Sequence, residues 1–143
     1  MSQLINTDQA MQTLGCELAQ RLDFPFCLEL IGDVGAGKTT FVKGLASGLK
    51  SRDQVTSPSF TINNRYDLSD GRVLAHYDFY RLGEAGVLMQ ELAEDLSDTQ
   101  TAVVMEWAQP VQEILPNERM VVTIDYTLDG RTVDIKERHA TTS

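Results

Sequence analysis

The sequence predicts a single α/β domain with a mixed sheet that includes two antiparallel hairpins. Three observations carry this prediction. A glycine-rich loop at residues 32–39 joins a short apolar run to a helical pattern. A second apolar run, at 101–107, is typical of another buried strand. Two alternating segments are each interrupted by an Asp-Gly pair, at 70–71 and at 129–130, which hairpin turns favour.

The N-terminal half alternates helix and strand. A helix is expected over residues 6–22, with Asn6 as its cap. Its apolar side chains recur at helical spacing: Met11, Leu14, Leu18 and Leu22. Residues 26–31 form an apolar run that predicts a buried strand. After Gly37 a second helix has an apolar side made of Phe41, Val42, Leu45 and Leu49. Residues 55–58 are expected to be a loop, because a proline disfavours helix in the residue before it.

The C-terminal half contains both hairpins. Residues 60–68 and 73–80 are expected to pair around the first Asp-Gly turn. A looser helix is expected over 82–96, where two glycines weaken the pattern. The alternating apolar residues between 120 and 135 predict the second hairpin. We expect one domain over 1–143, with a frayed tail at about 140–143.

Composition limits the classes of function. The chain has 12 Lys and Arg against 21 Asp and Glu, for a formal net charge of −9. This acid surplus argues against a direct grip on nucleic acid, and we expect no contact with DNA. No apolar run approaches the roughly 18 residues of a membrane-spanning helix. Two cysteines are too few for a disulfide framework, and we see no signal peptide, so we expect a cytoplasmic protein without membrane contact.

The run Gly-Asp-Val-Gly-Ala-Gly-Lys-Thr at 32–39 fits the phosphate-binding loop, G-x-x-x-x-G-K-[ST]. Glycines let backbone N–H groups turn toward an anion, and the helix that follows adds its N-terminal dipole. Lys38 can reach the β- and γ-phosphates of a nucleotide, and the Thr39 hydroxyl can bind Mg²⁺. The strand before the loop and the helix after it argue against a chance match. The expected nucleotide-contacting residues are Asp33, Val34, Gly35, Ala36, Gly37, Lys38, Thr39 and Thr40.

A phosphate loop also needs an acidic side chain to hold the metal, usually at the end of a neighbouring strand. Glu106 ends the run 101–106 and is expected to bind Mg²⁺ directly or through water, or to orient the attacking water; the alternative is a carboxylate that faces solvent. Asp78 is the second candidate, because it shares a strand face with His76 and Tyr80. That face is turned either toward a site or toward solvent. We do not expect His76 to bind a metal, since the sequence has no Cys/His cluster.

Two neighbouring features leave alternatives open. The hydroxyl-rich segment 56–61 can sense a γ-phosphate or can be a plain turn. Trp107 follows Glu106 directly, so it points across the strand or caps its end, and an isolated Trp is more typical of a core than of a contact. The catalytic set predicted from the sequence is Lys38, Glu106 and Asp78, and the metal set is Thr39 and Glu106.

The nucleotide is identified by elimination. The Asn-Lys-x-Asp motif by which GTPases read guanine does not occur, which favours ATP. A small-molecule kinase needs an arginine-rich lid, but no basic residue occurs between Arg81 and Arg119. Carboxylates accumulate there instead, which suits a protein partner with a basic surface. They are Glu84, Glu91, Glu94, Asp95, Asp98, Glu106, Glu113 and Glu118.

Four blocks together resemble the bacterial TsaE (YjeE) family, in family order, from about residue 8 to residue 135. They are residues 32–41, Ser57-Pro58-Ser59-Phe60, residues 76–82 (His-Tyr-Asp-Phe-Tyr-Arg-Leu) and Met105-Glu106-Trp107. The resemblance implies a P-loop ATPase that needs Mg²⁺ and is slow alone. It also implies a requirement for the threonylcarbamoyladenosine (t6A) modification at position 37 of ANN-decoding tRNAs. By the same resemblance TsaD and TsaB are the partners, and tRNA is reached indirectly through that complex.

The resemblance also assigns roles to residues. It implies that Thr39 and Glu106 hold Mg²⁺ and that Lys38 with the loop amides holds the phosphates. It implies that Asp78 and Trp107 are important for activity or docking. The chain departs from the family pattern in having Met11 where Thr is frequent and Ala108 where Pro is usual. Two other functions stay open: a nucleotide-gated binding module that docks on ATP without hydrolysis, and a small-molecule kinase.

Overall fold

The structure is a computed structural model of the whole chain and describes residues 2–32, 37–51, 63–79, 86–128 and 130–138. It contains a seven-stranded sheet in the order β1-β7-β6-β2-β5-β4-β3. The elements are β1 (Ser2–Ile5), α1 (Asp8–Arg21), β2 (Cys27–Gly32), α2 (Lys38–Gly48), β3 (Asn63–Asp67), β4 (Val73–Asp78), α3 (Gly86–Ser97), β5 (Thr101–Glu106), the 3-10 helix η1 (Gln109–Ile114), β6 (Arg119–Thr127) and β7 (Gly130–Arg138). The predicted α/β fold with a mixed sheet is confirmed.

The centre of the sheet is parallel and its flanks are antiparallel. Strand β2 pairs in parallel with β5 and β6, and β5 pairs in parallel with β4. Both predicted hairpins are present, as β3–β4 and β6–β7. The carboxyl ends of the parallel strands meet at one edge, where Glu106 lies in register with Leu30 on one side and Asp78 on the other. In open α/β sheets, ligands bind at this edge.

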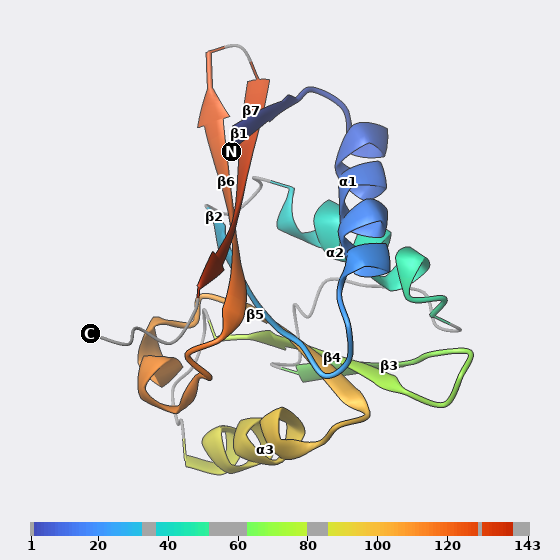
Figure 1. Cartoon of the computed structure of the whole chain (residues 1–143). Helices are drawn as coiled ribbons and strands as arrows, with labels where there is room; N and C mark the ends of the chain where they lie inside the picture. The colour runs from blue at the N-terminus through green and yellow to red at the C-terminus, as the bar shows by residue number, and fades with distance from the viewer. Residues whose placement is uncertain (1, 33–36, 52–62, 80–85, 129, 139–143) are drawn as a thin grey trace.

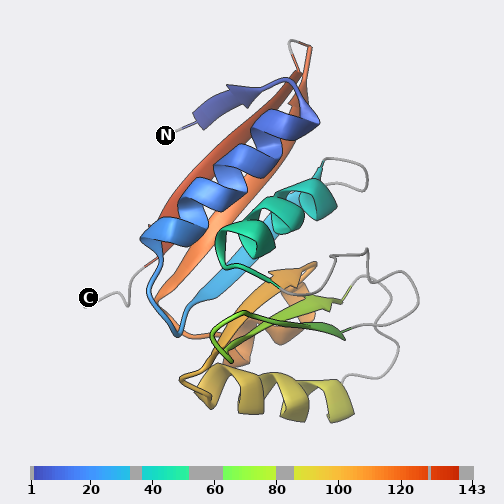
Figure 2. The ribbon, with the colours of Figure 1, turned by 90° about the vertical axis from the view of Figure 1, so that its right-hand side faces the viewer.

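Helices cover both faces of the sheet (Figure 1, Figure 2). Helices α1 and α2 lie side by side over one face, and their apolar side chains share a buried cluster with alternate residues of the strands. Helix α3 and η1 cover the other face with a second cluster. Along β4 the even-numbered Leu74 belongs to the first cluster and the odd-numbered Tyr77 and Phe79 to the second, so the predicted two-residue alternation is confirmed.

Helices α1 and α2 approach so closely that glycines are required between them. A Cβ atom added to Gly44 would lie 2.0 Å from the carbonyl oxygen of Gln12, and one added to Gly15 would lie 2.5 Å from that of Phe41. Backbone atoms cannot give way as a flexible side-chain end does. The contact positions α2, whose first residues belong to the phosphate loop.

The Gly44→Ala variant is therefore expected to lower the free energy of unfolding by about 1–3 kcal/mol, as overpacking does elsewhere. Urea unfolding followed by circular dichroism measures the change. Ser47→Ala is the matched control, because Ser47 is exposed on the same helix and should change stability by less than about 0.5 kcal/mol. Equal midpoints for wild type and Gly44→Ala would show that the helices separate without cost.

Cys27 lies at the start of β2 with only 6% of its surface exposed. Burial raises the pKa of its thiol from 9.0 to about 12, although Arg119 nearby opposes the shift. The unfolded thiol loses its proton above pH 9 while the folded thiol keeps it. The folded state thus binds more protons in this window, and stability is lost as the pH rises.

We expect the urea midpoint to fall between about pH 8 and about pH 10, and to fall less steeply in Cys27→Ala. Cys16→Ala is the control, because Cys16 is partly exposed on α1 and should leave the slope unchanged. Identical slopes for wild type and Cys27→Ala would contradict the raised pKa.

One expectation about the elements needs correction, and two elements were missed. Helix α1 begins at Asp8 and its cap is Thr7, whose hydroxyl accepts the N–H of Ala10 at 3.0 Å; the predicted cap, Asn6, lies against Gly130 instead. Strand β1 was not predicted, because four residues on a sheet edge are too few to show a pattern. Helix η1 was also missed, since its single 3-10 stretch lacks a helical apolar repeat.

Other expectations fall outside the described residues. These are the loop at 55–58, the segment 56–61, the start of the helix predicted from 82, and the tail. Among the helices that the structure describes, none is long and apolar enough to cross a membrane.

Candidate functional site

The phosphate loop connects the carboxyl end of β2 to the start of α2. Of its predicted contact residues, Asp33, Val34, Gly35 and Ala36 lie outside the described part of the chain. Gly37 caps α2 with a φ of 104°, a left-handed conformation that glycine adopts without strain. Thr39 and Thr40 lie half-buried in the first turn of α2, where backbone N–H groups have no partner within the helix. This end of α2 is therefore suited to an anion.

Gly37 also lies against two side chains. A Cβ atom placed on it would lie 2.8 Å from Nη1 of Arg131 and 3.4 Å from Cε of Met11. Arg131 is the second residue of β7 and pairs with Asp8 at 3.2 Å. The departure from the family pattern at Met11 thus lies beside the loop. Arg131 was not predicted, although a Gly-Arg pair after a hairpin turn was visible in the sequence.

Lys38 is buried at the edge where β2 and β5 end, with 6% of its surface exposed. Its Nζ donates a hydrogen bond to the Gly32 carbonyl at 2.5 Å and lies 3.8 Å from Oε1 of Glu106. The same ammonium lies 4.2 Å from the centre of the Trp107 ring. Glu106 and Trp107 therefore both lie against the Lys38 ammonium, although they follow it by 68 and 69 positions in the sequence.

Glu106 ends β5 with 4% of its surface exposed. The alternative of a carboxylate facing solvent is therefore wrong. Its Oε2 lies 2.5 Å from Nε2 of His76, and its Oε1 faces Lys38. A buried carboxylate is costly unless it is paired and hydrogen-bonded, and these two partners supply both conditions.

The face of β4 that carries His76 and Asp78 is turned inward rather than toward water. His76 is fully buried, and its ring lies 6.4 Å from that of Tyr66. Asp78 is half-buried, directly opposite Glu106 in the strand pairing. The alternative of a face turned toward solvent is thus wrong for His76 and Asp78. Tyr80 lies outside the described residues. Two-residue alternation within each strand places His76 of β4 and Glu106 of β5 on the same face of the sheet. Only the strand order shows that β4 and β5 are neighbours.

Trp107 packs against the second apolar cluster, as expected of a core tryptophan, and its ring also contacts Lys38. Its backbone has a φ of 57°, which is uncommon outside glycine, and its side chain is half-buried. The left-handed residue interrupts the strand alternation and turns the ring toward the Lys38 ammonium. Ala108 then caps η1 and is buried. Cation–π contacts of this kind contribute about 0.5–2 kcal/mol.

The acidic stretch between 82 and 118 does not form one exposed face. Asp95 is buried and accepts hydrogen bonds from Arg65 at 2.8 Å and from the Tyr77 hydroxyl at 2.5 Å. Burial, together with this bond to Asp95, raises the pKa of Tyr77. Glu91 accepts from Asn63. Several of these carboxylates therefore attach α3 to the sheet.

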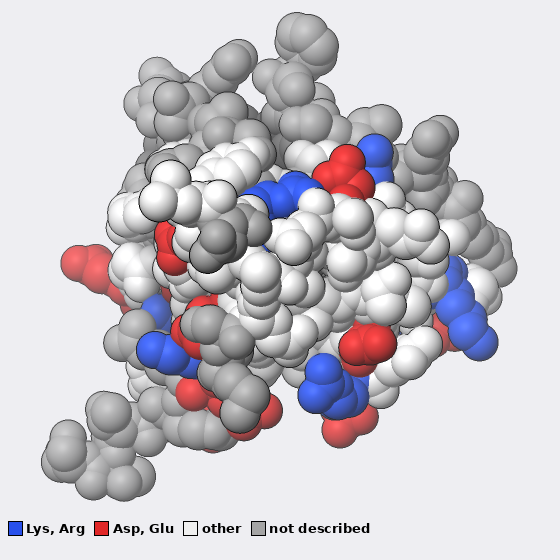
Figure 3. Space-filling model, turned by 90° about the horizontal axis from the view of Figure 1, so that it is seen from above, with Lys and Arg blue, Asp and Glu red and all other residues white. Residues whose placement is uncertain are grey.

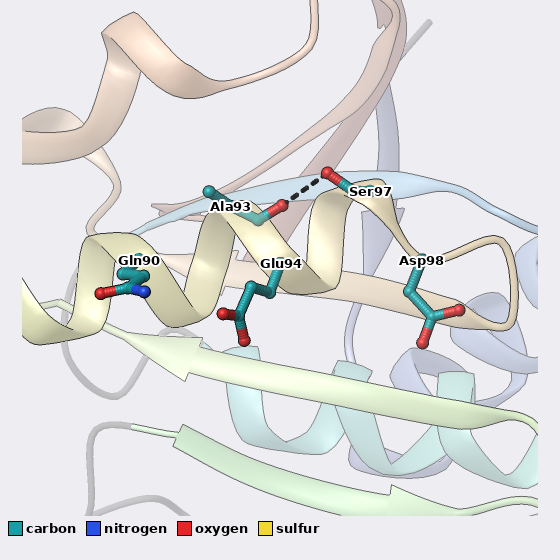
Figure 4. Close-up of a pocket in the computed structure, with 5 residues that line it drawn as sticks. All are labelled: Gln90, Ala93, Glu94, Ser97 and Asp98. Atoms are coloured by element: carbon teal, nitrogen blue, oxygen red, sulfur yellow. Dashed lines mark hydrogen bonds between the residues drawn. The ribbon is translucent and has the colours of Figure 1, made fainter.

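The side of α3 that carries Gln90, Glu94 and Asp98 has an open pocket (Figure 4). It is lined by Gln90, Ala93, Glu94, Ser97 and Asp98. The hydroxyl of Ser97 donates to the Ala93 carbonyl at 2.9 Å, so part of its polarity is satisfied within the helix.

The residues at the β2–β5 edge fit a nucleotide with magnesium. The described residues contain no group of three or more His, Cys, Asp or Glu that could hold a metal alone. Magnesium differs from zinc or calcium in needing only one or two protein ligands when phosphate oxygens and water supply the rest. One buried carboxylate, a Thr in the first turn of α2 and a buried lysine match that requirement.

The family model described as threonylcarbamoyl adenosine biosynthesis protein TsaE matches residues 5–133. The chain belongs to the TsaE family. A Streptomyces coelicolor relative, named tRNA threonylcarbamoyladenosine biosynthesis protein TsaE, is 39% identical over 132 residues, which are 92% of this chain and 88% of that protein. A Bacillus subtilis protein of the same name is 43% identical over 103 residues, 68% of this chain and 60% of that protein.

The fold agrees with the TsaE family as well. The crystal structure of Bacillus subtilis YdiB superposes with a TM-score of 0.73 at 30% identity, covering 98% of this chain and 86% of that one. The family resemblance seen in the four sequence blocks is thus confirmed by the matched range and by the fold. The chain is accordingly a member of a P-loop, ATPase-like family.

Proposed function

We propose that this chain is the ATP-binding and ATP-hydrolysing subunit required for t6A formation in tRNA. Membership in the TsaE family supports the pathway, because its relatives are named for tRNA threonylcarbamoyladenosine biosynthesis. One observation carries the chemistry: the buried Lys38 ammonium lies between the Gly32 carbonyl and the Glu106 carboxylate at the start of α2. A cation, a carboxylate and the amides of a helix N-terminus are the parts that phosphoryl transfer uses.

The proposed roles follow from the contacts. Lys38 is held by neutral and anionic oxygens, which phosphate oxygens can replace when the nucleotide enters. The loop amides and the first turn of α2 orient the phosphates. Magnesium, when bound, neutralises charge on the β- and γ-phosphates. Thr39 and Glu106 would hold it, and Glu106 is also placed to orient the attacking water.

During hydrolysis the water oxygen forms a bond to the γ-phosphorus while the bond to the ADP oxygen breaks. Free phosphate and ADP leave, and the proton of the water goes to a phosphate oxygen or to Glu106. Asp78 lies opposite Glu106 on the neighbouring strand, so we assign it a supporting role at this edge. Trp107 limits the movement of Lys38 by its ring contact.

We propose TsaD and TsaB as partners that hold the tRNA, with the chain in the cytoplasm. Charge supports an indirect role in tRNA chemistry, since the net charge is −9. In the view of Figure 3, basic and acidic side chains of the described residues lie in small mixed groups rather than in a basic field. Both cysteines are free, as a reducing compartment requires.

Reconstitution tests this proposal. The chain is combined with purified TsaD, TsaB, an ANN-decoding tRNA and a source of threonylcarbamoyl adenylate, and t6A is measured with ATP, with a non-hydrolysable ATP analogue, or with neither. We expect repeated rounds of modification only with ATP, together with release of ADP and phosphate. Equal repeated turnover with the analogue would instead favour the binding module, and phosphoryl transfer to an added small molecule would favour the kinase.

A further inference from the structure

His76 is a buried group to which the proposed chemistry gives no task. It lies on β4 with 0% of its surface exposed, opposite Val104 of β5 in the strand pairing. Among the described residues its ring makes one polar contact, between Nε2 and Oε2 of Glu106 at 2.5 Å. Burying a polar ring costs free energy unless the ring is hydrogen-bonded, so the bond to Glu106 is what compensates the burial of His76.

The hydrogen-bond network assigns the tautomer. An ionised carboxylate only accepts, so Nε2 must carry the hydrogen that bridges His76 and Glu106. Among the described residues, no partner contacts the buried Nδ1. A bare lone pair there costs less than a buried N–H without an acceptor, because donors are rarely left orphaned. The geometry therefore fits a ring that donates through Nε2.

Because of this single bond, the two oxygens of the Glu106 carboxylate have different partners. Oε2 is held by His76, while Oε1 faces Lys38 at 3.8 Å. The two strands cannot slide, because β4 and β5 are paired from Val73↔Thr101 to Asp78↔Glu106. A rigid donor on one oxygen thus fixes the direction of the other, as outer-shell partners do for metal-binding carboxylates.

We propose that His76 is a positioning residue, which holds Glu106 so that Oε1 faces the magnesium–nucleotide site. This inference rests on the proposed function. It predicts a defect specific to magnesium: the ring touches neither the phosphate loop nor Lys38 in any contact that the described residues show, so the affinity for metal-free nucleotide does not depend on it.

The test compares His76→Leu, which loses the donor, with His76→Gln, whose amide can reach Glu106. Calorimetry measures ADP affinity without magnesium and at increasing magnesium, and phosphate release gives kcat and KM. For His76→Leu we expect the magnesium concentration for half-maximal tightening to rise about 10- to 100-fold. Metal-free affinity should stay within about twofold, and His76→Gln should recover most of the loss.

Tyr77→Phe is the matched control. It removes one buried hydrogen bond to a carboxylate from the adjacent residue of the same strand, but on the opposite face. It should lower the melting temperature and leave the magnesium dependence unchanged. If the leucine variant does not fold, His76→Asn replaces it, because its amide is one methylene too short for Glu106.

Results that contradict the positioning role differ from the result that contradicts the proposed function. Wild-type magnesium dependence in folded His76→Leu, or equal defects in the Gln and the Leu or Asn variants, would overturn the positioning role. A magnesium shift in Tyr77→Phe as large as that in His76→Leu would also overturn it. Failure of the wild-type chain to bind any adenine nucleotide would overturn the proposed function itself, which is a different result.

Discussion

The Lys38→Ala variant is expected to lose nucleotide binding while keeping the fold. The wild-type ammonium is a buried charge beside the start of α2, where it bonds to the Gly32 carbonyl and lies near Glu106. A charge-assisted contact to phosphate contributes about 1.5–3 kcal/mol, and Lys38 can reach two phosphates. We therefore expect ATP and ADP affinity to fall about 100-fold or more, measured by calorimetry.

Lys43→Ala controls for the loss of a positive charge, because Lys43 is exposed on the same helix. Its affinity should match the wild type within about twofold. Circular dichroism verifies that Lys38→Ala keeps its secondary structure, although leaving Glu106 without its cation should lower the melting temperature. Unchanged ATP affinity in a folded Lys38→Ala would refute the phosphate role.

The Glu106→Gln variant is expected to bind ATP and to hydrolyse it at least about 100-fold more slowly, the usual size of a lost general base or water-orienting group. The amide keeps the shape of the side chain and can still accept from His76 Nε2, so the fold is preserved. Phosphate release under saturating ATP measures the rate. Calorimetry measures binding separately, which distinguishes loss of chemistry from loss of substrate.

Glu94→Gln is the control here, since Glu94 lines the open pocket on the outer side of α3, where a neutral amide should leave turnover unchanged. The same variants decide whether hydrolysis matters to modification. If Glu106→Gln and Glu106→Ala still support repeated rounds of t6A formation, ATP binding alone suffices, and the module interpretation replaces the ATPase. Hydrolysis by Glu106→Gln at the wild-type rate would remove Glu106 from the mechanism altogether.

Local patterns predicted most of the elements, because each depends on residues close in sequence. The two-residue alternation of β6 and β7 and the glycine loop before α2 are of this kind. Strand β1 and η1 escaped because they are short and lack a periodic pattern. The cap of α1 was displaced by one residue, since Asn6 and Thr7 are both good caps and only the position of Gly130 separates them.

The site was predicted in type but not in detail. The motif named Lys38, and the strand end named Glu106, because both follow from local sequence. Their link through His76 depends on which strands are neighbours, and strand order is a long-range property. The contact of Trp107 with Lys38 was not predicted, because the left-handed backbone of Trp107, rather than its residue type, aims the ring at the ammonium. No spacing rule forecasts such a conformation.

The position of β5 between β2 and β4 has a consequence for how the chain acquires its activity. Strand β5 follows β4 in sequence, yet it lies between β4 and β2 in the sheet, so the contacts of Lys38 with Glu106 and Trp107 form only once distant segments have come together. Nucleotide binding should then occur only in molecules whose whole sheet has formed. A nucleotide that binds only this finished state raises the melting point of every strand together, by mass action. Folding intermediates that lack β5 are expected not to bind ATP, so a partly folded chain does not compete with the folded protein for the nucleotide.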